Sequence, residues 1–299
     1  MAKKTDSLDD LRREIDGIDT SIHDLIMRRT KIVERVRDVK GDTPVKIRPA
    51  REAEILYQLM TRHTGPFPKC ELARMWREMI VATLSFEGPF SVAVYVTDEI
   101  PGYWDLARDQ YGSFTPMTRH GSNRSVVESV RTQDATLGIL PLPQRDESEN
   151  WWRFLVSEAP EAPKVIARLP FIGEGNARDP GVEALVIGPV AHEETGRDRS
   201  FLAIEVEEDI GFASIEAALS QAGHSAAFHQ VWHDPDRPPE WTYLIEAFGF
   251  FTDSGPRRAL FMDGLDQRTK RVIHLGGYAT PLSEGDLAPS SAGVPGTKE

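Results

Sequence analysis

One stretch decides the fold: residues 8–39 read LDDLRREIDGIDTSIHDLIMRRTKIVERVRDV. Its apolar side chains recur at alternating intervals of three and four, the spacing of one continuous stripe along an α-helix. They are Leu8, Leu11, Ile15, Ile18, Ile22, Leu25, Ile32, Val36 and Val39. Ser7 and Asp10 suit a capping box at the start of this helix. Because such a helix is far longer than the usual ~11–12 residues, it needs partners along its stripe, and we expect a helical dimer.

Arg29 interrupts the stripe. The spacing calls for an apolar residue four positions after Leu25, but the chain has an arginine there. A guanidinium keeps its proton and is costly to bury without a partner. We therefore expect an anion beside Arg29. The pattern leaves open whether that anion is a carboxylate of the protein or a bound ligand.

Two shorter helices follow the first. Pro49 suits the first turn of a second helix, which Gly65-Pro66 ends. A third helix is expected over 69–87, before Gly88-Pro89 closes the all-helical part. One stripe of the third helix consists of Trp76, Ile80, Thr83 and Glu87. Its last two members are polar, so a hydroxyl and a carboxyl project on the same face as a tryptophan.

Several charged side chains could share a site with Arg29. Lys40 lies eleven residues further on, about three helical turns, and so on nearly the same side of the first helix. Arg51 and Glu52 open the second helix, and Arg12 flanks the stripe near its start. Each of these residues also has a purely structural explanation.

For Lys40 that explanation is the helix dipole. For Thr83 it is a hydrogen bond to its own backbone, and for Glu87 a helix end. Arg12, Arg51 and Glu52 would then be ordinary exposed side chains.

From residue 90 onward, short strands alternate with helices, which indicates an α/β region. Strands are expected over 91–96, 137–140, 164–167 and 184–188, a helix over 125–131, and a polar linker over 189–199. The final unit, over 200–274, reads strand–helix–strand–strand–helix–strand, the order of a split βαβ sandwich. Residues after Leu282 have the composition of a disordered segment. The predicted domains are 1–89, 90–197 and 198–284, with a disordered tail at 285–299.

Composition excludes several classes of function. The net charge of the 299 residues is −12; residues 1–88 contribute +2 and the remainder −14. Nucleic-acid binding by the acidic part is not expected, because it would repel phosphates. The single cysteine, Cys70, allows no intrachain disulfide and no cysteine-built metal site. No run approaches the ~20 apolar residues of a membrane span, and 1–10 lack the apolar core of a secretory signal. We therefore expect a cytoplasmic protein without membrane contact.

Residues 8–87 resemble the all-helical chorismate mutases in length, helix order and placement of charge. The segments that carry the resemblance are Leu11-Arg12-Arg13-Glu14-Ile15-Asp16-Gly17-Ile18-Asp19, Arg28-Arg29, Val39-Lys40 and Arg51-Glu52-Ala53-Glu54-Ile55-Leu56. The resemblance implies an intertwined homodimer that rearranges chorismate to prephenate without cofactor or metal. It also implies that one arginine of each site comes from the neighbouring protomer.

The resemblance assigns a role to each candidate residue. Arg29 would hold one substrate carboxylate, and Arg12 of the neighbouring protomer the other. Lys40 and Glu87 would flank the ether oxygen, where Glu87 donates a hydrogen bond only when it is protonated. The remaining contacts would be Glu52 on the ring hydroxyl, with Arg51 and Thr83 completing the pocket wall. Arg48 stands where many family members have an acid, which puts that contact in doubt.

The remaining domains resemble weakened versions of known modules. Residues 126–141 are similar to part of prephenate dehydratase, but Leu142-Pro143-Gln144 and Val182-Glu183-Ala184 replace two of its signatures, so dehydratase activity is not expected. Residues 200–282, with Gly276-Gly277-Tyr278, look like an ACT-type regulatory module. An aromatic amino-acid effector and a simple scaffolding role both stay open for it. The alternatives to a mutase are a bifunctional mutase and dehydratase, or a non-catalytic sensor of aromatic metabolites.

Overall fold

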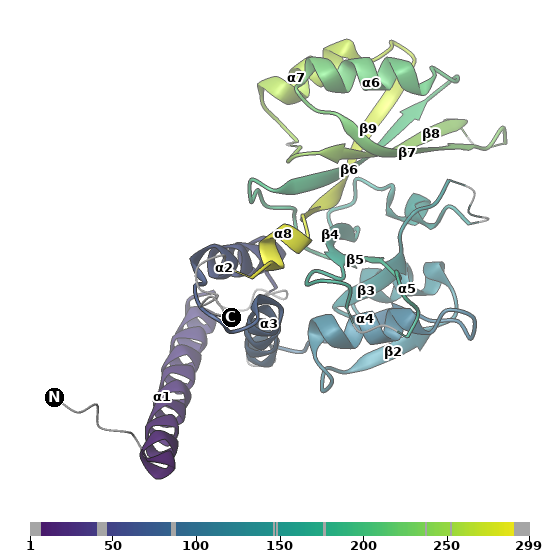
Figure 1. The fold of residues 1–299 in the computed structure, drawn as a ribbon. Coiled ribbons are helices and arrows are strands. Elements are labelled where there is room, and N and C mark those ends of the chain that lie inside the picture. Colours follow the sequence, from purple (N-terminus) through teal and green to yellow (C-terminus); the bar gives the residue numbers. More distant parts are fainter. Residues whose placement is uncertain are drawn as a thin grey trace, which may run out of the picture.

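The computed structural model describes residues 7–40, 47–84, 88–145, 147, 149–175, 178–236, 238–251 and 253–289, and leaves the side chain of Lys40 undescribed. A helical part comes first in the chain, and a large mixed sheet with flanking helices follows (Figure 1). The multi-domain class predicted from the sequence is thereby confirmed. No helix among the described residues is long and apolar enough to cross a membrane.

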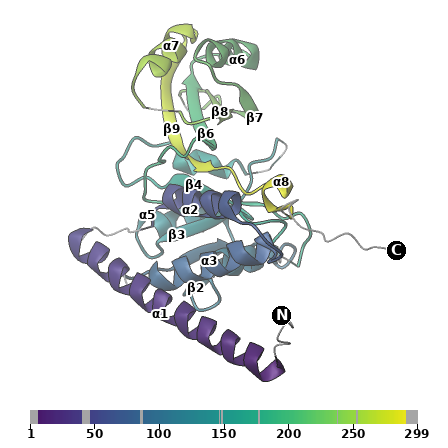
Figure 2. The ribbon, with the colours of Figure 1, turned by 60° about the vertical axis from the view of Figure 1, so that its left-hand side comes forward.

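Three helices form the first part: α1 (Leu8–Lys40), α2 (Pro49–Arg62) and α3 (Lys69–Leu84). The predicted capping box begins α1, since the Asp10 amide donates to Ser7 Oγ at 3.2 Å and the Ser7 amide to Asp10 Oδ2 at 3.3 Å. Proline opens α2 as expected. α1 is a long rod at the edge of the molecule (Figures 1 and 2), whereas α2 and α3 pack onto the body of the protein.

The sheet has nine strands in the order β2-β1-β3-β5-β4-β9-β6-β8-β7. Its first half contains β1 (Val92–Tyr95), β2 (Met117–His120), β3 (Leu137–Pro141), β4 (Lys164–Leu169) and β5 (Ala184–Gly188). Helix α4 (Gly102–Tyr111) packs on one face of this half, and α5 (Asn123–Arg131) on the other. Two elements, α4 and β2, were not predicted; β2 is a four-residue edge strand none of whose side chains is buried, so it lacks the apolar alternation that marks a half-buried strand.

The second half is the predicted split βαβ sandwich. Its elements are β6 (Asp198–Val206), α6 (Phe212–Gln221), β7 (Ala226–His233), β8 (Trp241–Phe248), α7 (Pro256–Gly264) and β9 (Thr269–Ala279). All four strands pair antiparallel. Helices α6 and α7 cover one face, and the short 3₁₀ helix η2 (Trp151–Leu155), also missed, buries two tryptophans against the other.

Glycines join the two halves of the sheet. β4 pairs with β9 at one position, where Val165 lies opposite Gly276. A β-carbon on Gly276 would lie 2.2 Å from the Val165 carbonyl oxygen, and one on Gly277 would lie 2.2 Å from the Arg199 carbonyl oxygen. Only glycine allows such an approach. The Gly276-Gly277 pair thus makes one continuous sheet across the predicted boundary at residue 197.

Two expectations about the second half need correction. The predicted linker ends earlier, since Asp198 and Arg199 belong to β6. The predicted tail at 285–299 begins too early, because α8 (Glu284–Leu287) is ordered by a capping box between Ser283 and Asp286. The rest of that segment, from 290, lies outside the described residues.

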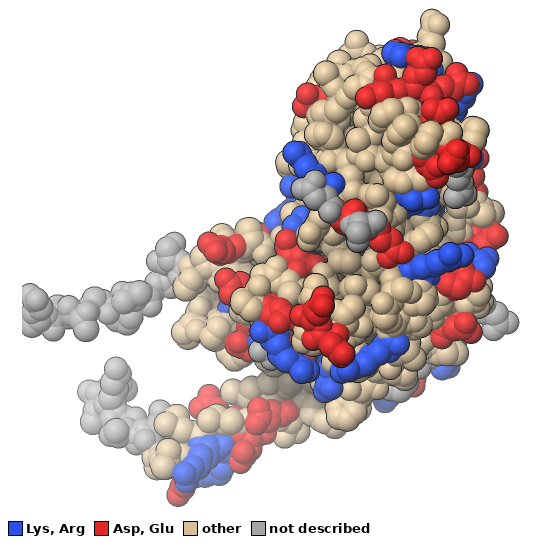
Figure 3. Space-filling view, turned by 90° about the vertical axis from the view of Figure 1, so that its right-hand side faces the viewer, with Lys and Arg blue, Asp and Glu red and all other residues tan. Residues whose placement is uncertain are grey.

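Acidic side chains gather near the top of the molecule, over the second half of the sheet (Figure 3).

Candidate active site

The stripe of α1 is exposed along its whole length. Leu25 is 63% exposed, Ile18 52% and Ile32 49%, and the other stripe residues are at least as accessible as Val36 at 41%. Fully burying one such side chain is worth roughly 1.5–3 kcal/mol. A row of nine of them is therefore a large exposed apolar surface, and burying it against another helix would be favourable.

Arg29 differs from its neighbours on this rod. Its guanidinium is half-buried, and Nη1 is fully enclosed without a hydrogen-bond partner among the described residues. Burial lowers the pKa of Arg29, since it removes water from the charged form. In the described part of the chain no carboxylate pairs with it. The described residues therefore do not support the alternative to a bound ligand, which is an ion pair between Arg29 and a carboxylate of its own chain.

Glu52 has a partner that the sequence analysis missed. In the interior between α2 and α3, the Arg77 guanidinium donates to Glu52 Oε2 and also lies over the Phe171 ring, 5.8 Å from its centroid. Arg77 is only 3% exposed. The signal for Arg77 was present, because Ala73, Arg77, Ile80 and Leu84 recur at intervals of four, three and four. Like Arg29, Arg77 stands where helical spacing calls for an apolar residue, so the pattern predicts an anion beside it as well.

The other candidate residues occupy different surroundings. Thr83 is buried and its hydroxyl donates to the Ile80 carbonyl at 2.7 Å. Arg51 is exposed and pairs with Glu54 at 3.0 Å. Arg12 is exposed and lies 3.5 Å from Asp9. Glu87 and the side chain of Lys40 lie outside the described residues.

A single chain therefore does not gather the candidate residues into one pocket. Arg12 and Arg29 lie on the α1 rod, whereas Glu52 and Thr83 face the interior beside α2 and α3. Groups with three or more metal-binding side chains are absent from the described ranges. Within the described part of the chain, the geometry offers a rod with an exposed apolar stripe and, on that rod, an arginine whose enclosed Nη1 has no hydrogen-bond partner.

Comparison with known proteins identifies the helical part. Residues 11–88 match the chorismate mutase type II family. These residues form a chorismate mutase type II domain, as the resemblance predicted.

The similar curated proteins are all larger. The chain is 30% identical over 148 residues to the bifunctional chorismate mutase/prephenate dehydratase of Pseudomonas aeruginosa, covering 48% of this chain and 40% of the relative. It is 31% identical over 142 residues to the bifunctional enzyme of Aquifex aeolicus, covering 46% and 39%. The chain thus spans about two fifths of the length of these relatives.

Two solved structures are similar at low identity. One is GqqA, described as a novel type of quorum quenching acylase, at 11% identity and a TM-score of 0.47, covering 68% of this chain and 100% of that one. The other is prephenate dehydratase from Arthrobacter aurescens in complex with L-Phe, at 12% identity and a TM-score of 0.49, covering 68% and 93%.

Proposed function

We propose that the chain is a cytoplasmic chorismate mutase that works as a homodimer and converts chorismate to prephenate. The observation that carries the proposal is Arg29, whose enclosed Nη1 has no partner among the described residues, on a rod whose apolar stripe is exposed. A second copy of α1 would cover the stripe, and a substrate carboxylate would satisfy Arg29. The family match over residues 11–88 supports the same assignment.

The reaction suits these residue types. The rearrangement is unimolecular and needs no nucleophile, cofactor or metal. An enzyme accelerates it by holding a flexible dianion in its compact reactive conformation and by stabilising charge on the ether oxygen. In the proposal Arg29 and the partner subunit's Arg12 hold the two carboxylates, while Lys40 and Glu87 stabilise the ether oxygen.

Arg51, Glu52 and Thr83 would complete the pocket, with Glu52 on the ring hydroxyl. Glu52 is already engaged by Arg77, so in this proposal Arg77 holds the carboxylate in the orientation in which it meets the substrate. Arg48, which replaces the acid common in the family, pairs with Glu193 of the α/β region at 3.0 Å. This contact gives Arg48 a structural role outside the pocket.

Dehydratase activity is not part of the proposal. Glu183 stands where a dehydratase has an arginine, and it pairs with Arg168 at 2.8 Å. A carboxylate at this position would repel an anionic substrate.

A product assay tests the proposal. The full chain is incubated with chorismate, its disappearance is followed, and prephenate and phenylpyruvate are quantified separately by chromatography. We expect prephenate to accumulate in step with chorismate loss, without phenylpyruvate above the rate of a blank. Formation of phenylpyruvate would favour the bifunctional alternative. Binding of chorismate without turnover would favour the sensor.

A further inference from the structure

Glu52 lies in a closed space against the α/β body, the part of the protein formed by residues 90–289. Its carboxylate pairs with Arg77, and the residue is only 7% exposed. The space beside this pair has a volume of about 20 Å³, room for about one water molecule. The residues of the α/β body that line it are Gln110, Tyr111, Ile166, Ala167, Phe171 and Ala279. The α/β body therefore forms most of the wall around Glu52.

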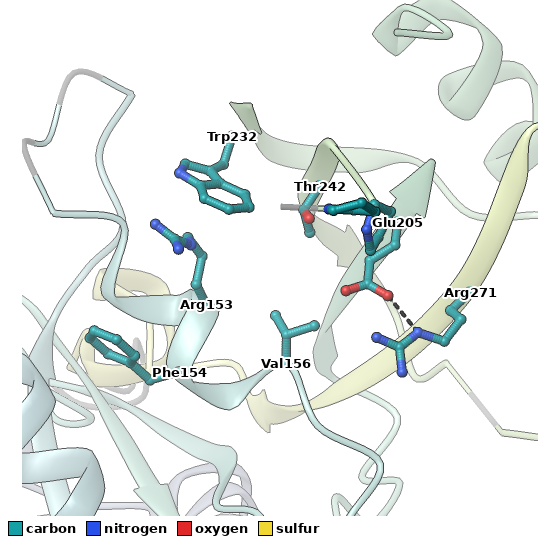
Figure 4. A pocket seen from close by; sticks show the side chains of 9 residues that line it. Arg153, Phe154, Val156, Glu205, Trp232, Thr242 and Arg271 are labelled. Atoms are coloured by element: carbon teal, nitrogen blue, oxygen red, sulfur yellow. Dashed lines mark hydrogen bonds and ion pairs between the residues drawn. The ribbon is translucent and has the colours of Figure 1, made fainter. Parts of the chain in front are cut away.

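This space is too small for a substrate. Sites for small molecules commonly have volumes of roughly 300–1,000 Å³. The protein has a cavity of that size elsewhere, about 380 Å³ between η2 and the second half of the sheet, where Arg271 donates to Glu205 (Figure 4). That cavity shares no lining residue with the proposed mutase site. A substrate that must contact Glu52 therefore does not fit while the α/β body stays in place.

Contacts of α2 hold it on the α/β body. The Tyr57 hydroxyl donates to the Thr280 carbonyl, and the centroid of the Tyr57 ring lies 6.0 Å from that of Phe171. The other neighbour of the Phe171 ring is the Arg77 guanidinium, 5.8 Å from the centroid. Phe171 thus takes part in the attachment of α2 and also closes the space at Glu52.

The candidate mutase residues therefore differ in what they face. Arg29 lies on α1, whose apolar stripe is open to a partner subunit. Glu52 faces the α/β body of its own chain. A substrate held by Arg29 can meet Glu52 only when the α/β body moves off it. When the competent state of a protein is populated only in part, its apparent affinity for the substrate falls by that fraction.

We propose that the α/β body autoinhibits the mutase. Docked on α2 and α3, it excludes the substrate from Glu52, and turnover requires its release. This inference rests on the proposed function, in which Glu52 binds the ring hydroxyl of chorismate. The attachment contacts belong to α2 and not to α1, so release leaves the pairing of α1 with a second copy intact.

A disulfide between α3 and the α/β body tests the proposal, because Cys70 is the single cysteine of the chain. A β-carbon on Gly173 would lie 3.9 Å from Cys70 Sγ. Gly173→Cys therefore places a second thiol within reach of a disulfide that fixes the docked arrangement. We expect kcat/KM for chorismate to fall by about tenfold or more when the full chain is oxidised, and to return on reduction.

Gly173→Ser is the matched control for the disulfide. It brings the same strain at a positive φ without the thiol, and its activity should not respond to the oxidant. Mass spectrometry verifies that the disulfide has formed in Gly173→Cys. Sedimentation verifies that the oxidised and reduced forms are both dimers, so that a loss of activity reports on docking and not on dissociation.

A releasing variant tests the opposite direction. Leu282 is buried in the cluster between α2 and the α/β body, and Leu282→Asp places a charge there that disfavours docking. We expect kcat/KM to rise by about threefold or more, while circular dichroism verifies that the variant is folded. Leu260→Asp, at an exposed position of α7, is the control and should leave kcat/KM unchanged.

The outcomes separate this inference from the proposed function. Equal activity of the oxidised and reduced Gly173→Cys chain, or no gain of activity in Leu282→Asp, would overturn autoinhibition and leave the mutase standing. Absence of chorismate turnover in every form, the reduced and released forms included, would overturn the mutase itself, and autoinhibition with it.

Discussion

Arg29 and Arg77 both stand where helical spacing calls for an apolar residue, but they differ in whether a carboxylate of the same chain lies beside them. Arg77 has the Glu52 carboxylate beside it, inside the protein. Arg29 has no such neighbour among the described residues, and its Nη1 atom is enclosed. The sequence pattern predicts that each arginine needs an anion. It cannot predict which one finds that anion in its own chain, because the Arg77–Glu52 contact depends on how α2 packs against α3.

Arg77→Met tests this contact. The substitution removes the Arg77 guanidinium from the buried Glu52 carboxylate, and breaking a buried ion pair on one side costs about 3–5 kcal/mol. We expect the free energy of unfolding, measured with urea, to fall by about 3 kcal/mol. Arg74→Met, on the exposed side of the same helix, is the control and should stay within about 0.5 kcal/mol. If the two variants behave alike, the ion pair does not hold α2 against α3.

At the scale of elements, the notable feature of α1 is that its apolar stripe stays exposed in a single chain. Its bounds could be predicted because the stripe and the capping box are local signals. Short elements such as α4 and η2 could not, since packing on the sheet decides them. α8 was missed for another reason: the Ser283–Asp286 capping box is hidden in a segment rich in Gly, Pro and Ser.

Ile18→Asp tests whether α1 pairs with a second copy. Ile18 lies within the exposed stripe, and a carboxylate there cannot be buried in a helix–helix interface without a large cost. We expect sedimentation to show a dimer for the natural chain and a monomer for the variant, with loss of mutase activity. Thr20→Asp places the same charge on the opposite side of α1 and should remain dimeric. A dimeric, active Ile18→Asp variant would contradict the pairing.

At the scale of the whole molecule, the end of the chain fastens the helical part to the sheet. Leu56 and Met60 of α2 pack against Phe171, Ile172 and Leu282. Around this cluster, Lys69 Nζ donates to the Asp286 carbonyl at 3.0 Å, and Arg197 pairs with the Asp286 carboxylate at 2.7 Å. No local pattern announces such contacts, because they join residues more than eighty positions apart.

Asp286→Asn tests this connection through its pH dependence. The Arg197 guanidinium holds the pKa of Asp286 below its usual range. A carboxyl group with a lowered folded-state pKa contributes stability above the unfolded pKa of about 3.9, and this contribution is lost as the pH falls. We expect the variant to be less stable by about 1 kcal/mol at neutral pH, allowing for solvent screening, and the difference to be clearly smaller near about pH 2.

Asp263→Asn in α7 is the control, because Asp263 is exposed. It should change the free energy of unfolding little at either pH. A difference between Asp286→Asn and the natural chain that is the same at both pH values would show that the charge of Asp286 plays no part.

Arg29→Ala, assayed for chorismate turnover alongside sedimentation, tests the central claim most directly. Because the proposal gives Arg29 a substrate carboxylate, we expect kcat/KM to fall by roughly 100-fold or more while the dimer stays folded. Arg28→Ala, its exposed neighbour on α1, should keep its activity. A fully active Arg29→Ala variant, or one whose dimer falls apart, would contradict the assignment of Arg29 to the substrate.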